Sequence, residues 1–482
     1  MSNSHKGADS CANFSLQDSL SLLNSTVDQL PAQRLVNQAP SAPQLSQILD
    51  VSLEQQPAAP EQLLQAAKDY LHYNPDVGQV DFFKLLYSGL NAPALFGDWI
   101  TSISNATMHT YQVSPVATLM ELELIKQWNA LVGFTQGDGV MVSGGSQANL
   151  IAMMLARHKK APQAKTKGLQ GQTLVAYVSD QAHYSSLKAV NVLGIGSDNL
   201  ISVKSDEQGR IDPTSLEQAI NASLAKGHTP FFIGLTAGTT VLGAFDPVAP
   251  CSDIAKKYDV WLHIDGAWGA PVLFSQKHKH LLADVELADS VAWDAHKFMN
   301  VPITAAVILV KEAGLLNAAC SGGGGEYLFH KDENYHYNLG ERSIQCGRRA
   351  DALKVWMSWK AKGSQGFSDK VDHLFSCKDY CLEQVEQNDK LQMLAPAAYL
   401  NVLFRYQPTD GSSLDETQLN ELNIKICKAM KEQGTFTDYA TYKGQTGIRL
   451  ILANENCQLT DIDNMLAKCI EFGDQIQATT NR

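Results

Sequence analysis

The sequence predicts an α/β fold, with a mainly parallel sheet in a large domain and a smaller α+β domain after it. Runs of apolar residues alternate with helical stretches through the middle of the chain, and most of these runs are too apolar for a sheet with one wet face. After Gly347 the pattern changes to long helical stretches with short strands between them. At 482 residues the chain is also too long for one ordinary hydrophobic core, so we expect two packed domains.

The large domain is expected to span residues 111–362. Helical stretches separate its candidate strands, and this alternation indicates parallel strands in one sheet that is covered by helices on both faces. The candidate strands are residues 139–143, 173–178, 230–235, 260–264, 290–293 and 305–310.

Two segments precede this domain. Residues 1–60 are rich in Gln, Ser, Ala and Pro, so we expect them to be partly flexible, with short helices at 16–23 and 46–53. A helical pattern begins at Glu61 and leads into the main body, which predicts a helical segment over residues 61–110.

The small domain is expected to span residues 363–482. A helix over 348–362 should lead into it. The further elements that the pattern predicts are helices at 369–388, 416–433 and 461–472 and a strand at 446–452, with apolar segments at 393–395 and 399–405 between them.

Net charge and composition exclude several functions. A formal net charge of −12 and a pI near 5.5 leave no broad basic surface for nucleic acid or for an anionic membrane. No apolar stretch is long enough to span a bilayer, and no apolar signal region follows Met1. The nine cysteines are odd in number and lack CxxC spacing. We therefore expect reduced thiols in a cytoplasmic protein, with neither disulfides nor a metal site.

A lysine and an aspartate in the large domain indicate a pyridoxal-phosphate enzyme. Lys297 follows His296 just beyond the apolar run 290–293, and Asp265 lies at the end of another candidate strand, 32 residues upstream. A lysine that forms a Schiff base with this cofactor needs a nearby carboxylate that keeps the ring nitrogen protonated, so that the ring withdraws electrons from Cα. Asp265 is the candidate for that carboxylate, and Ala267 is small enough to let a ring lie flat.

Three more motifs lie where the chain leaves predicted strands, which is where α/β sheets bind their ligands. In segment 143–149 a strand ends in two glycines and a helix opens, so the backbone at Gly145 and the hydroxyl of Ser146 suit a phosphate. His183 offers a flat ring that could stack on a cofactor ring. Thr236 offers a hydroxyl near the cofactor's face or its phenolic oxygen.

The chain resembles the group II pyridoxal-phosphate decarboxylases of fold type I, which include glutamate, cysteine-sulfinate, aspartate and aromatic amino-acid decarboxylases. The resemblance extends from about Asp81 to the carboxyl terminus. The block from Glu326 through Ile-Gln-Cys-Gly-Arg-Arg at 344–349 to 359–363 is most similar to the glutamate and cysteine-sulfinate branch. The resemblance implies a seven-stranded type of sheet and a homodimer with its active site at the subunit interface. It also implies that residues 61–110 pack in the dimer.

The resemblance implies a role for each residue that matches the family. Lys297 would hold pyridoxal 5′-phosphate covalently, Asp265 would pair with its ring nitrogen and His183 would stack on the ring. Gly145 and Ser146 would bind the phosphate.

The same comparison implies roles for three further residues. His296 would contact the phosphate or the region of the departing carboxylate, and Thr236 would lie near the ring. Arg449 would bind a substrate carboxylate, which an arginine holds with two parallel hydrogen bonds.

The glycine-rich segment 322–329 matches the family's mobile catalytic loop, which reaches the active site from the neighbouring subunit. Its four glycines cost much entropy to order, which suits a lid that closes only over bound substrate. Tyr327 matches the tyrosine that protonates Cα after CO₂ has left.

Three positions depart from the family pattern. Leu85 stands where glutamate decarboxylases have glutamine, and His109 stands where they have phenylalanine. Leu85 removes a donor for a long side-chain carboxylate, and His109 could supply one nearby. Asp294, where animal enzymes of that branch have asparagine, places an acid near the expected phosphate, so it should point away from the phosphate or pair with a donor.

The sequence therefore predicts a carboxy-lyase that converts a small acidic L-amino acid into an amine and CO₂, with aspartate, glutamate and cysteine sulfinate all open as substrates. Diaminobutyrate or an aromatic amino acid is an alternative substrate, and an aminotransferase or an oxidative decarboxylase is an alternative enzyme. Tyr327 argues against the oxidative reaction, because related enzymes that form carbonyl products have phenylalanine there. A non-catalytic relative is expected to lack Lys297, Asp265 or Tyr327, and all three are present.

Overall fold

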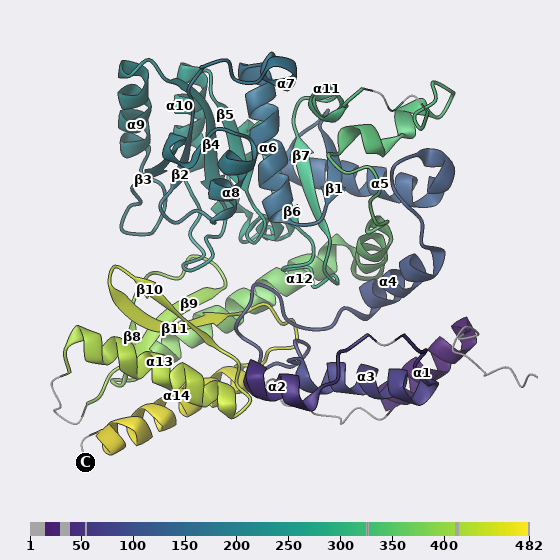
Figure 1. The fold of residues 1–482 in the computed structure, drawn as a ribbon. Helices are drawn as coiled ribbons and strands as arrows, with labels where there is room; N and C mark the ends of the chain where they lie inside the picture. Colours follow the sequence, from purple (N-terminus) through teal and green to yellow (C-terminus); the bar gives the residue numbers. More distant parts are fainter. Residues whose placement is uncertain are drawn as a thin grey trace, which may run out of the picture.

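A seven-stranded sheet forms the centre of the large domain in the computed structural model, which describes residues 15–28, 39–53, 55–323, 325, 327–409 and 414–480 (Figure 1). The strand order is β1-β7-β6-β5-β4-β2-β3. Strand β7 pairs antiparallel with β1 and β6, and the remaining pairs of the sheet are parallel. The strands are β1 (Asp138–Val142), β2 (Leu174–Ser179), β3 (Leu200–Val203), β4 (Thr229–Thr236), β5 (Trp261–Asp265), β6 (Ser290–Asp294) and β7 (Ala306–Val310). This confirms the predicted mainly parallel sheet.

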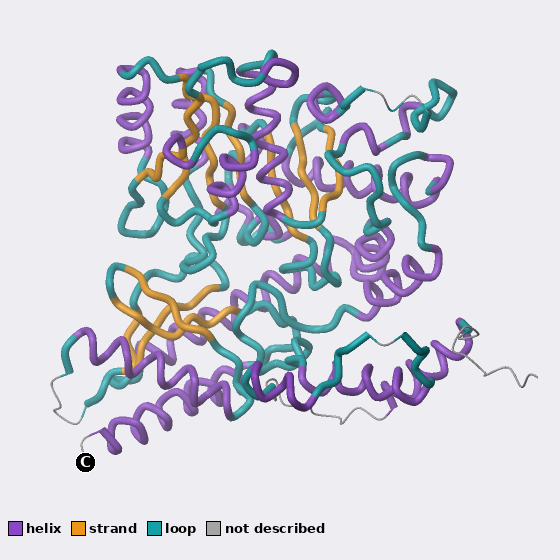
Figure 2. Tube along the Cα trace, viewed as in Figure 1, coloured by secondary structure: helices purple, strands orange, loops and turns teal. Residues whose placement is uncertain are grey.

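Helices cover both faces of this sheet (Figure 2). From β1, Val140 and Val142 pack in the hydrophobic cluster that includes Ile151 of α6, whereas Met141 packs in the cluster that includes Leu124 of α5. Because successive side chains of a strand point to opposite faces, a sheet covered on both sides requires apolar residues at every position. The helices of this domain are α5 (Pro115–Val132), α6 (Gly145–Lys160), α7 (Ala164–Lys167), α8 (Ser185–Val192), α9 (Pro213–Ala225), α10 (Val248–Tyr258) and α11 (Leu315–Cys320).

One strand of the sheet lies outside the six predicted ones. Strand β3 is at the edge, where Leu200 and Ile201 are partly buried and Ser202 is exposed. A half-exposed edge strand lacks the continuous apolar run by which its neighbours are recognised.

The small domain contains a four-stranded antiparallel sheet with the order β10-β11-β9-β8, and this confirms the predicted α+β domain. The two helices predicted on either side of residue 363 form one element, α12, with a break at Gly363 (φ 64°, ψ 171°). Glycine takes this positive φ without a steric cost. The elements are α12 (Ala352–Glu386), β8 (Leu391–Met393), β9 (Asn401–Tyr406), α13 (Glu416–Glu432), β10 (Asp438–Tyr442), β11 (Gln445–Ile451) and α14 (Leu459–Thr480).

The amino-terminal helices are α1 (Leu16–Asp28), α2 (Ala42–Ile48), α3 (Pro60–Tyr73) and α4 (Ala92–Ser104). The predicted helix over 46–53 is wrong, because α2 begins after Ser41 and ends at Ile48. Pro43 lies in its first turn, and the side chain of Gln44 accepts a hydrogen bond from the Ser41 backbone N–H (3.1 Å). These are start signals of a helix, and they set its register. Among the helices that the structure describes, none is long and apolar enough to cross a membrane.

The segment before α4 joins the small domain and positions part of the candidate site. Phe83 donates its backbone N–H to the carbonyl oxygen of Phe436 (3.0 Å) and accepts a hydrogen bond from the Ile451 backbone N–H (3.0 Å). The rings of Phe82 and Phe436 stack with their centroids 5.2 Å apart. This pairing brings the residues that follow Phe83 alongside β11.

Candidate active site

Three side chains predicted to serve the cofactor lie at the ends of adjacent strands. Thr236 ends β4, Asp265 ends β5 and Asp294 ends β6, and Thr236 pairs in register with Asp265. Because these strands are parallel, their carboxyl ends lie at one edge of the sheet, where α/β proteins bind their ligands. Lys297 follows β6 at this edge, and its backbone N–H donates to the Asp294 carbonyl oxygen (3.2 Å).

The carboxylate of Asp294 lies close to Lys297 and His296. Its Oδ2 is 3.2 Å from Lys297 Nζ and 3.5 Å from His296 Nε2. The Asp294 side chain is only 2% exposed, and its Oδ1 has no hydrogen-bond partner among the described residues. The Asp294 carboxylate thus lies within ion-pair distance of Lys297, which is one of the two arrangements expected for it.

His296 lies against the turn that precedes α6. Its Nδ1 is 2.8 Å from the Ala305 carbonyl oxygen, which fixes the ring. Burial lowers the pKa of His296, and the nearby Asp294 acts in the opposite direction. A Cβ added at Gly144 would lie 3.7 Å from His296 Cε1, so the ring is next to the turn where a phosphate is expected.

Gly145, at the start of α6, leaves space that a side chain would fill. A Cβ at Gly145 would lie 3.0 Å from Ala267 Cβ and 3.1 Å from Asp294 Oδ2, and both are closer than ordinary contacts. Helix α6 begins at Gly145 and continues with Ser146, so the unpaired N–H groups of its first turn lie at the strand edge described above. The arrangement suits an anion that approaches the backbone closely.

Asp265 is held through both of its carboxylate oxygens. Oδ2 accepts a hydrogen bond from Asn149 Nδ2 (2.7 Å), and Oδ1 accepts one from the Ala267 backbone N–H (3.1 Å). Both oxygens act as acceptors, as an ionised carboxylate requires. The group is therefore oriented before any ligand binds.

His183 lies within electrostatic reach of Asp265 and Lys297. Burial is the main effect and lowers the pKa of His183, Asp265 raises it, and Lys297 lowers it further. The Ser185 backbone N–H lies 3.3 Å from His183 Nδ1, which accepts its hydrogen bond. The structure thus brings together His183, Asp265, Asp294 and Lys297, which the sequence places in three separate segments.

Arg449 on β11 contacts the two segments that flank its guanidinium. Nη1 donates to the Thr240 carbonyl oxygen (3.2 Å), and Nη2 donates to the Lys84 carbonyl oxygen (2.8 Å). Burial lowers the pKa of Arg449, against the effect of Asp438. Its buried Nε has no hydrogen-bond partner among the described residues. Buried donors are normally hydrogen-bonded, and the carboxylate of a ligand could accept a hydrogen bond from Arg449 Nε.

Leu85 follows Lys84, whose carbonyl oxygen Arg449 binds, and it packs against Phe82 and Phe436. Its side chain is apolar and partly buried. The segment that holds Leu85 is therefore tied to Arg449 through the neighbouring Lys84 carbonyl oxygen.

His109 and Tyr327 lie apart from this group of residues. The His109 carbonyl oxygen accepts a hydrogen bond from the Gly340 backbone N–H (3.0 Å), and a Cβ at Gly340 would lie 2.9 Å from Phe329 Cζ. Tyr327 is 79% exposed. Within the described parts of one chain, no recorded interaction joins either residue to Lys297.

Two residues near Asp265 were not singled out from the sequence, namely Asn149, which donates to Asp265 Oδ2, and His263, which is hydrogen-bonded to Asn149. Asn149 is one helical turn beyond Gly145 in α6, and His263 is two residues before Asp265 in β5. Their spacing is the available signal, because side chains four apart on a helix or two apart on a strand share a face. That signal indicates a shared face but not a hydrogen bond.

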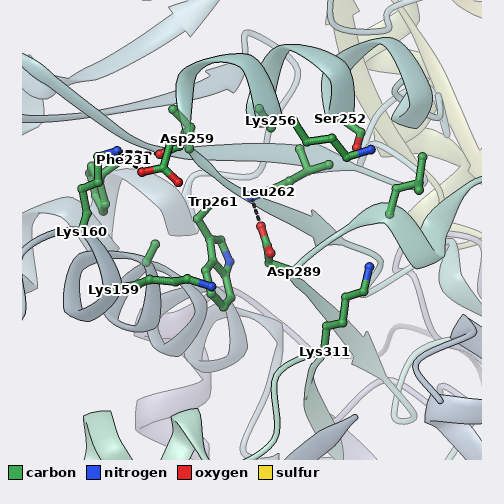
Figure 3. Close-up of a pocket in the computed structure, with 14 residues that line it drawn as sticks. Lys159, Lys160, Phe231, Ser252, Lys256, Asp259, Trp261, Leu262, Asp289 and Lys311 are labelled. Carbon is green, nitrogen blue, oxygen red and sulfur yellow. Dashed lines mark hydrogen bonds and ion pairs between the residues drawn. The ribbon is translucent and has the colours of Figure 1, made fainter. Parts of the chain in front are cut away.

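A cavity of about 400 Å³ lies at the opposite edge of the sheet (Figure 3). It is lined by Trp261 and Leu262, which begin β5, by Asp289 just before β6 and by Lys311 just after β7. Because Asp265 is at the other end of β5, this cavity is separate from the group around Lys297.

Comparisons with known proteins identify related sequences and solved structures with the same fold. The family described as pyridoxal-dependent decarboxylase conserved domain matches residues 43–407. The chain is 36% identical over 443 residues to cysteine sulfinic acid decarboxylase of Mus musculus, with 90% of each protein covered. It is 35% identical over 433 residues to acidic amino acid decarboxylase GADL1 of Homo sapiens, with 88% of this chain and 83% of that protein covered.

A solved structure gives the same result for the fold. The crystal structure of mouse CSAD in apo form superposes with a TM-score of 0.90 at 34% sequence identity, and the match covers 95% of this chain and 98% of that chain. The chain therefore belongs to the pyridoxal-dependent decarboxylase family.

Proposed function

We propose that this protein removes the α-carboxylate of a small acidic L-amino acid, namely aspartate, glutamate or cysteine sulfinate, and releases the amine and CO₂. The proximity of Lys297, Asp265 and His183 at the strand ends carries the proposal. The names of the relatives, cysteine sulfinic acid decarboxylase and acidic amino acid decarboxylase, support the acidic class. They do not favour the alternatives, which are an aminotransferase and a decarboxylase of diaminobutyrate or aromatic amino acids.

The residues at the strand ends fit pyridoxal 5′-phosphate. The space at Gly145 and the first turn of α6 suit its phosphate, with Ser146 as a further donor. Lys297 Nζ would bind the cofactor covalently, and the oriented Asp265 carboxylate would pair with the ring nitrogen. His183 would stack on the ring with Ala267 leaving room on the other side.

The reaction needs the α-carboxylate to be oriented and a proton to be returned. Pyridoxal phosphate supplies, when bound, an electron sink for the bond that breaks at Cα. Asp265 would keep the ring nitrogen protonated, and Thr236 would lie near the ring. His296 would contact the phosphate or the departing carboxylate. Tyr327 would then donate a proton to Cα.

Recognition of the acidic side chain or the α-carboxylate would fall to Arg449. Its Nε is buried and unpaired, and its two Nη atoms are anchored on the Thr240 and Lys84 carbonyl oxygens. The guanidinium is therefore held in place by two hydrogen bonds, and its Nε–H is left for an acid. Leu85 would limit the length of the substrate, and His109 would supply a further donor.

We also propose that the protein is a homodimer in which Tyr327 reaches the site of the neighbouring subunit. The exposure of Tyr327 supports this, because the chain that carries it leaves it in solvent. An apolar face on α4 supports it as well, since Phe96, Trp99 and Ile103 share one side of the helix and are 51%, 44% and 54% exposed. A cytoplasmic location is proposed on the odd number of cysteines and the lack of CxxC spacing.

The test is the release of CO₂ from a panel of acidic, aromatic and basic amino acids by the protein loaded with pyridoxal phosphate. Acidic substrates are expected to react at least about tenfold faster than aromatic ones, since the loss of one buried ion pair is worth that much. Arg449→Met should raise KM for the preferred acid. Equal turnover of aromatic substrates would contradict the proposed preference for acidic substrates. A wild-type protein that stays colourless with added cofactor would contradict the proposed pyridoxal-phosphate enzyme.

A further inference from the structure

A chain of buried hydrogen bonds runs from Trp261 to Asp265. Trp261 Nε1 donates to Ser290 Oγ (2.9 Å), and Ser290 Oγ lies 2.8 Å from His263 Nδ1. His263 Nε2 lies 2.9 Å from Asn149 Oδ1, and Asn149 Nδ2 donates to Asp265 Oδ2 (2.7 Å). The proposed reaction uses only the last of these five residues.

The fold explains why these side chains meet. His263 and Asp265 are two residues apart on β5 and therefore point to the same face of the sheet. Ser290 begins the adjacent strand β6 and pairs in register with His263. Helix α6 covers this face, and Asn149 lies in its second turn.

Only one assignment of donors and acceptors satisfies all of these hydrogen bonds when Asp265 is ionised and His263 is uncharged. An ionised Asp265 only accepts, so Asn149 must present its amide nitrogen to Asp265 and its oxygen to His263. His263 must then carry its proton on Nε2, and its Nδ1 accepts the hydroxyl proton of Ser290. Asn149 Nδ2 also donates to Ser185 Oγ (2.9 Å), so both of its hydrogens are used. A flipped Asn149 amide would turn an oxygen toward the carboxylate.

His263 is uncharged in this arrangement. Its side chain is almost fully enclosed, and burial lowers its pKa to about 4, although the nearby Asp265 acts in the opposite direction. A neutral His263 ring can orient the Asn149 amide without placing a positive charge near Asp265. The charge of Asp265 is therefore left for the cationic ring nitrogen of the cofactor.

We propose that His263 is a positioning residue, which acts through Asn149 to hold the Asp265 carboxylate in the orientation that pairs with the ring nitrogen of pyridoxal phosphate. This rests on the proposed role of Asp265. It adds two residues, His263 and Asn149, that touch neither substrate nor cofactor but set the affinity for the cofactor.

Two substitutions of His263 separate this role from simple packing. In His263→Gln the amide nitrogen reaches about the position of Nε2 and can still donate to Asn149. In His263→Asn the shorter side chain reaches only the position of Nδ1, so it keeps the contact with Ser290 and loses the one with Asn149. The measured quantities are the dissociation constant of pyridoxal phosphate for the apoprotein, by absorbance titration, and the thermal midpoint of the apoprotein. His280→Asn, at an exposed position, is the matched control.

His263→Asn is expected to raise the dissociation constant about tenfold or more, the effect of leaving one buried hydrogen bond unmade, whereas His263→Gln should stay within about threefold of wild type. A purely structural role predicts lower thermal midpoints for both variants with equal, unchanged affinities. Equal affinities in two folded variants would therefore overturn the proposal.

Asn149→Asp tests the same link without a change of volume, and it serves if His263→Asn does not fold. It sets a second carboxylate 2.7 Å from that of Asp265, so the dissociation constant should rise at least about tenfold. An unchanged constant would overturn the proposal.

The Asp265→Asn variant separates a failure of the positioning role from a failure of the proposals on which that role rests. If this variant binds the cofactor as the wild type does, the proposed role of Asp265 fails and this inference fails with it; if the wild type does not bind the cofactor, the proposed function fails as well. If Asp265→Asn binds weakly while His263→Asn and Asn149→Asp bind normally, only the positioning role is wrong.

Discussion

Lys370 Nζ donates a 2.5 Å hydrogen bond to the carbonyl oxygen of Phe298, the residue that follows Lys297. The Lys370 side chain is buried in α12, and its ammonium lies 4.7 Å from the centroid of the Phe298 ring. Asn91 Nδ2 donates to the next carbonyl oxygen, that of Met299 (3.0 Å). Two buried side chains thus anchor the backbone immediately after Lys297.

Stability is expected to depend on the protonation of Lys370. Burial lowers its pKa from 10.5 to about 7, with Glu455 acting to raise the pKa and Lys362 to lower it. The folded protein then binds fewer protons than the unfolded chain between these two values, so stability should rise as the pH increases from about 7 toward 10.5. Lys370→Met should remove most of that rise. The measurement is the thermal midpoint against pH, with the exposed Lys226→Met as control, and an unchanged slope in Lys370→Met would contradict the assignment.

Lys297→Ala is expected to abolish the visible absorbance of the bound cofactor and to reduce decarboxylation to background, because no other group at the site offers a covalent attachment. Circular dichroism should show an intact fold. Lys311→Ala, at the opposite edge of the sheet, is the matched control and should keep both colour and activity. A coloured, active Lys297→Ala protein would refute the role of this lysine.

Gly145→Ala should weaken cofactor binding. The added Cβ would lie 3.0 Å from Ala267 Cβ and 3.1 Å from Asp294 Oδ2, so these side chains or the start of α6 must give by a few tenths of an ångström. Overpacking of this kind costs about 1–3 kcal/mol, which predicts a roughly tenfold rise in the dissociation constant of pyridoxal phosphate. Gly322→Ala, where a Cβ would meet nothing within 4 Å, should leave it unchanged. Equal dissociation constants for Gly145→Ala and Gly322→Ala would show that the cofactor does not approach the backbone closely at Gly145.

Tyr327→Phe is expected to bind the cofactor normally but to lose most amine formation, since the hydroxyl that returns the proton to Cα is gone. The amine and CO₂ are measured separately, because CO₂ release without amine identifies a failure of protonation. Tyr337→Phe changes another exposed tyrosine of the same region and should have no effect. An unchanged yield of amine from Tyr327→Phe would reject the role given to this residue.

Leu85→Gln should shift the preference toward glutamate. The amide adds a donor beside Arg449 that a longer side-chain carboxylate can reach, so the ratio of kcat/KM for glutamate to that for aspartate is expected to increase. Leu90→Gln, at a position that is 62% exposed, is the control. If the ratio stays constant, Leu85 does not line the end of the substrate pocket.

The elements that position the cofactor residues are the ones that could be predicted from the sequence. Buried parallel strands are continuous apolar runs, and the polar residues Thr236, Asp265 and Asp294 mark where three of them end. The parallel topology then brings these ends together. The chemistry could be inferred before the structure because it is concentrated at these ends.

Other features depend on tertiary contacts that leave little trace in the sequence. Strand β10 alternates between exposed and partly buried positions at the edge of the small sheet, and it lies outside the predicted strands. The hydrogen bond between Asn149 and His263 joins residues 114 positions apart. No local pattern reports such a contact.

Some expectations stay predictions. These are the domain boundaries at 60, 110 and 362 and the roles of His109 and Tyr327. Residues 1–14, 29–38 and 54 of the predicted flexible segment, Cys11 among them, lie outside the described residues.

The pairing of Phe83 with Phe436 and Ile451 bears on how this protein could evolve. It brings Leu85 to Arg449 from a part of the chain that takes no part in the group around Lys297. Under the roles proposed for Leu85 and Arg449, substitutions in this short stretch would alter which acid is accepted while the residues around Lys297 stay unchanged. Selectivity and chemistry would then be encoded in separable pieces of the gene, and a new preference could arise without passing through an inactive ancestor.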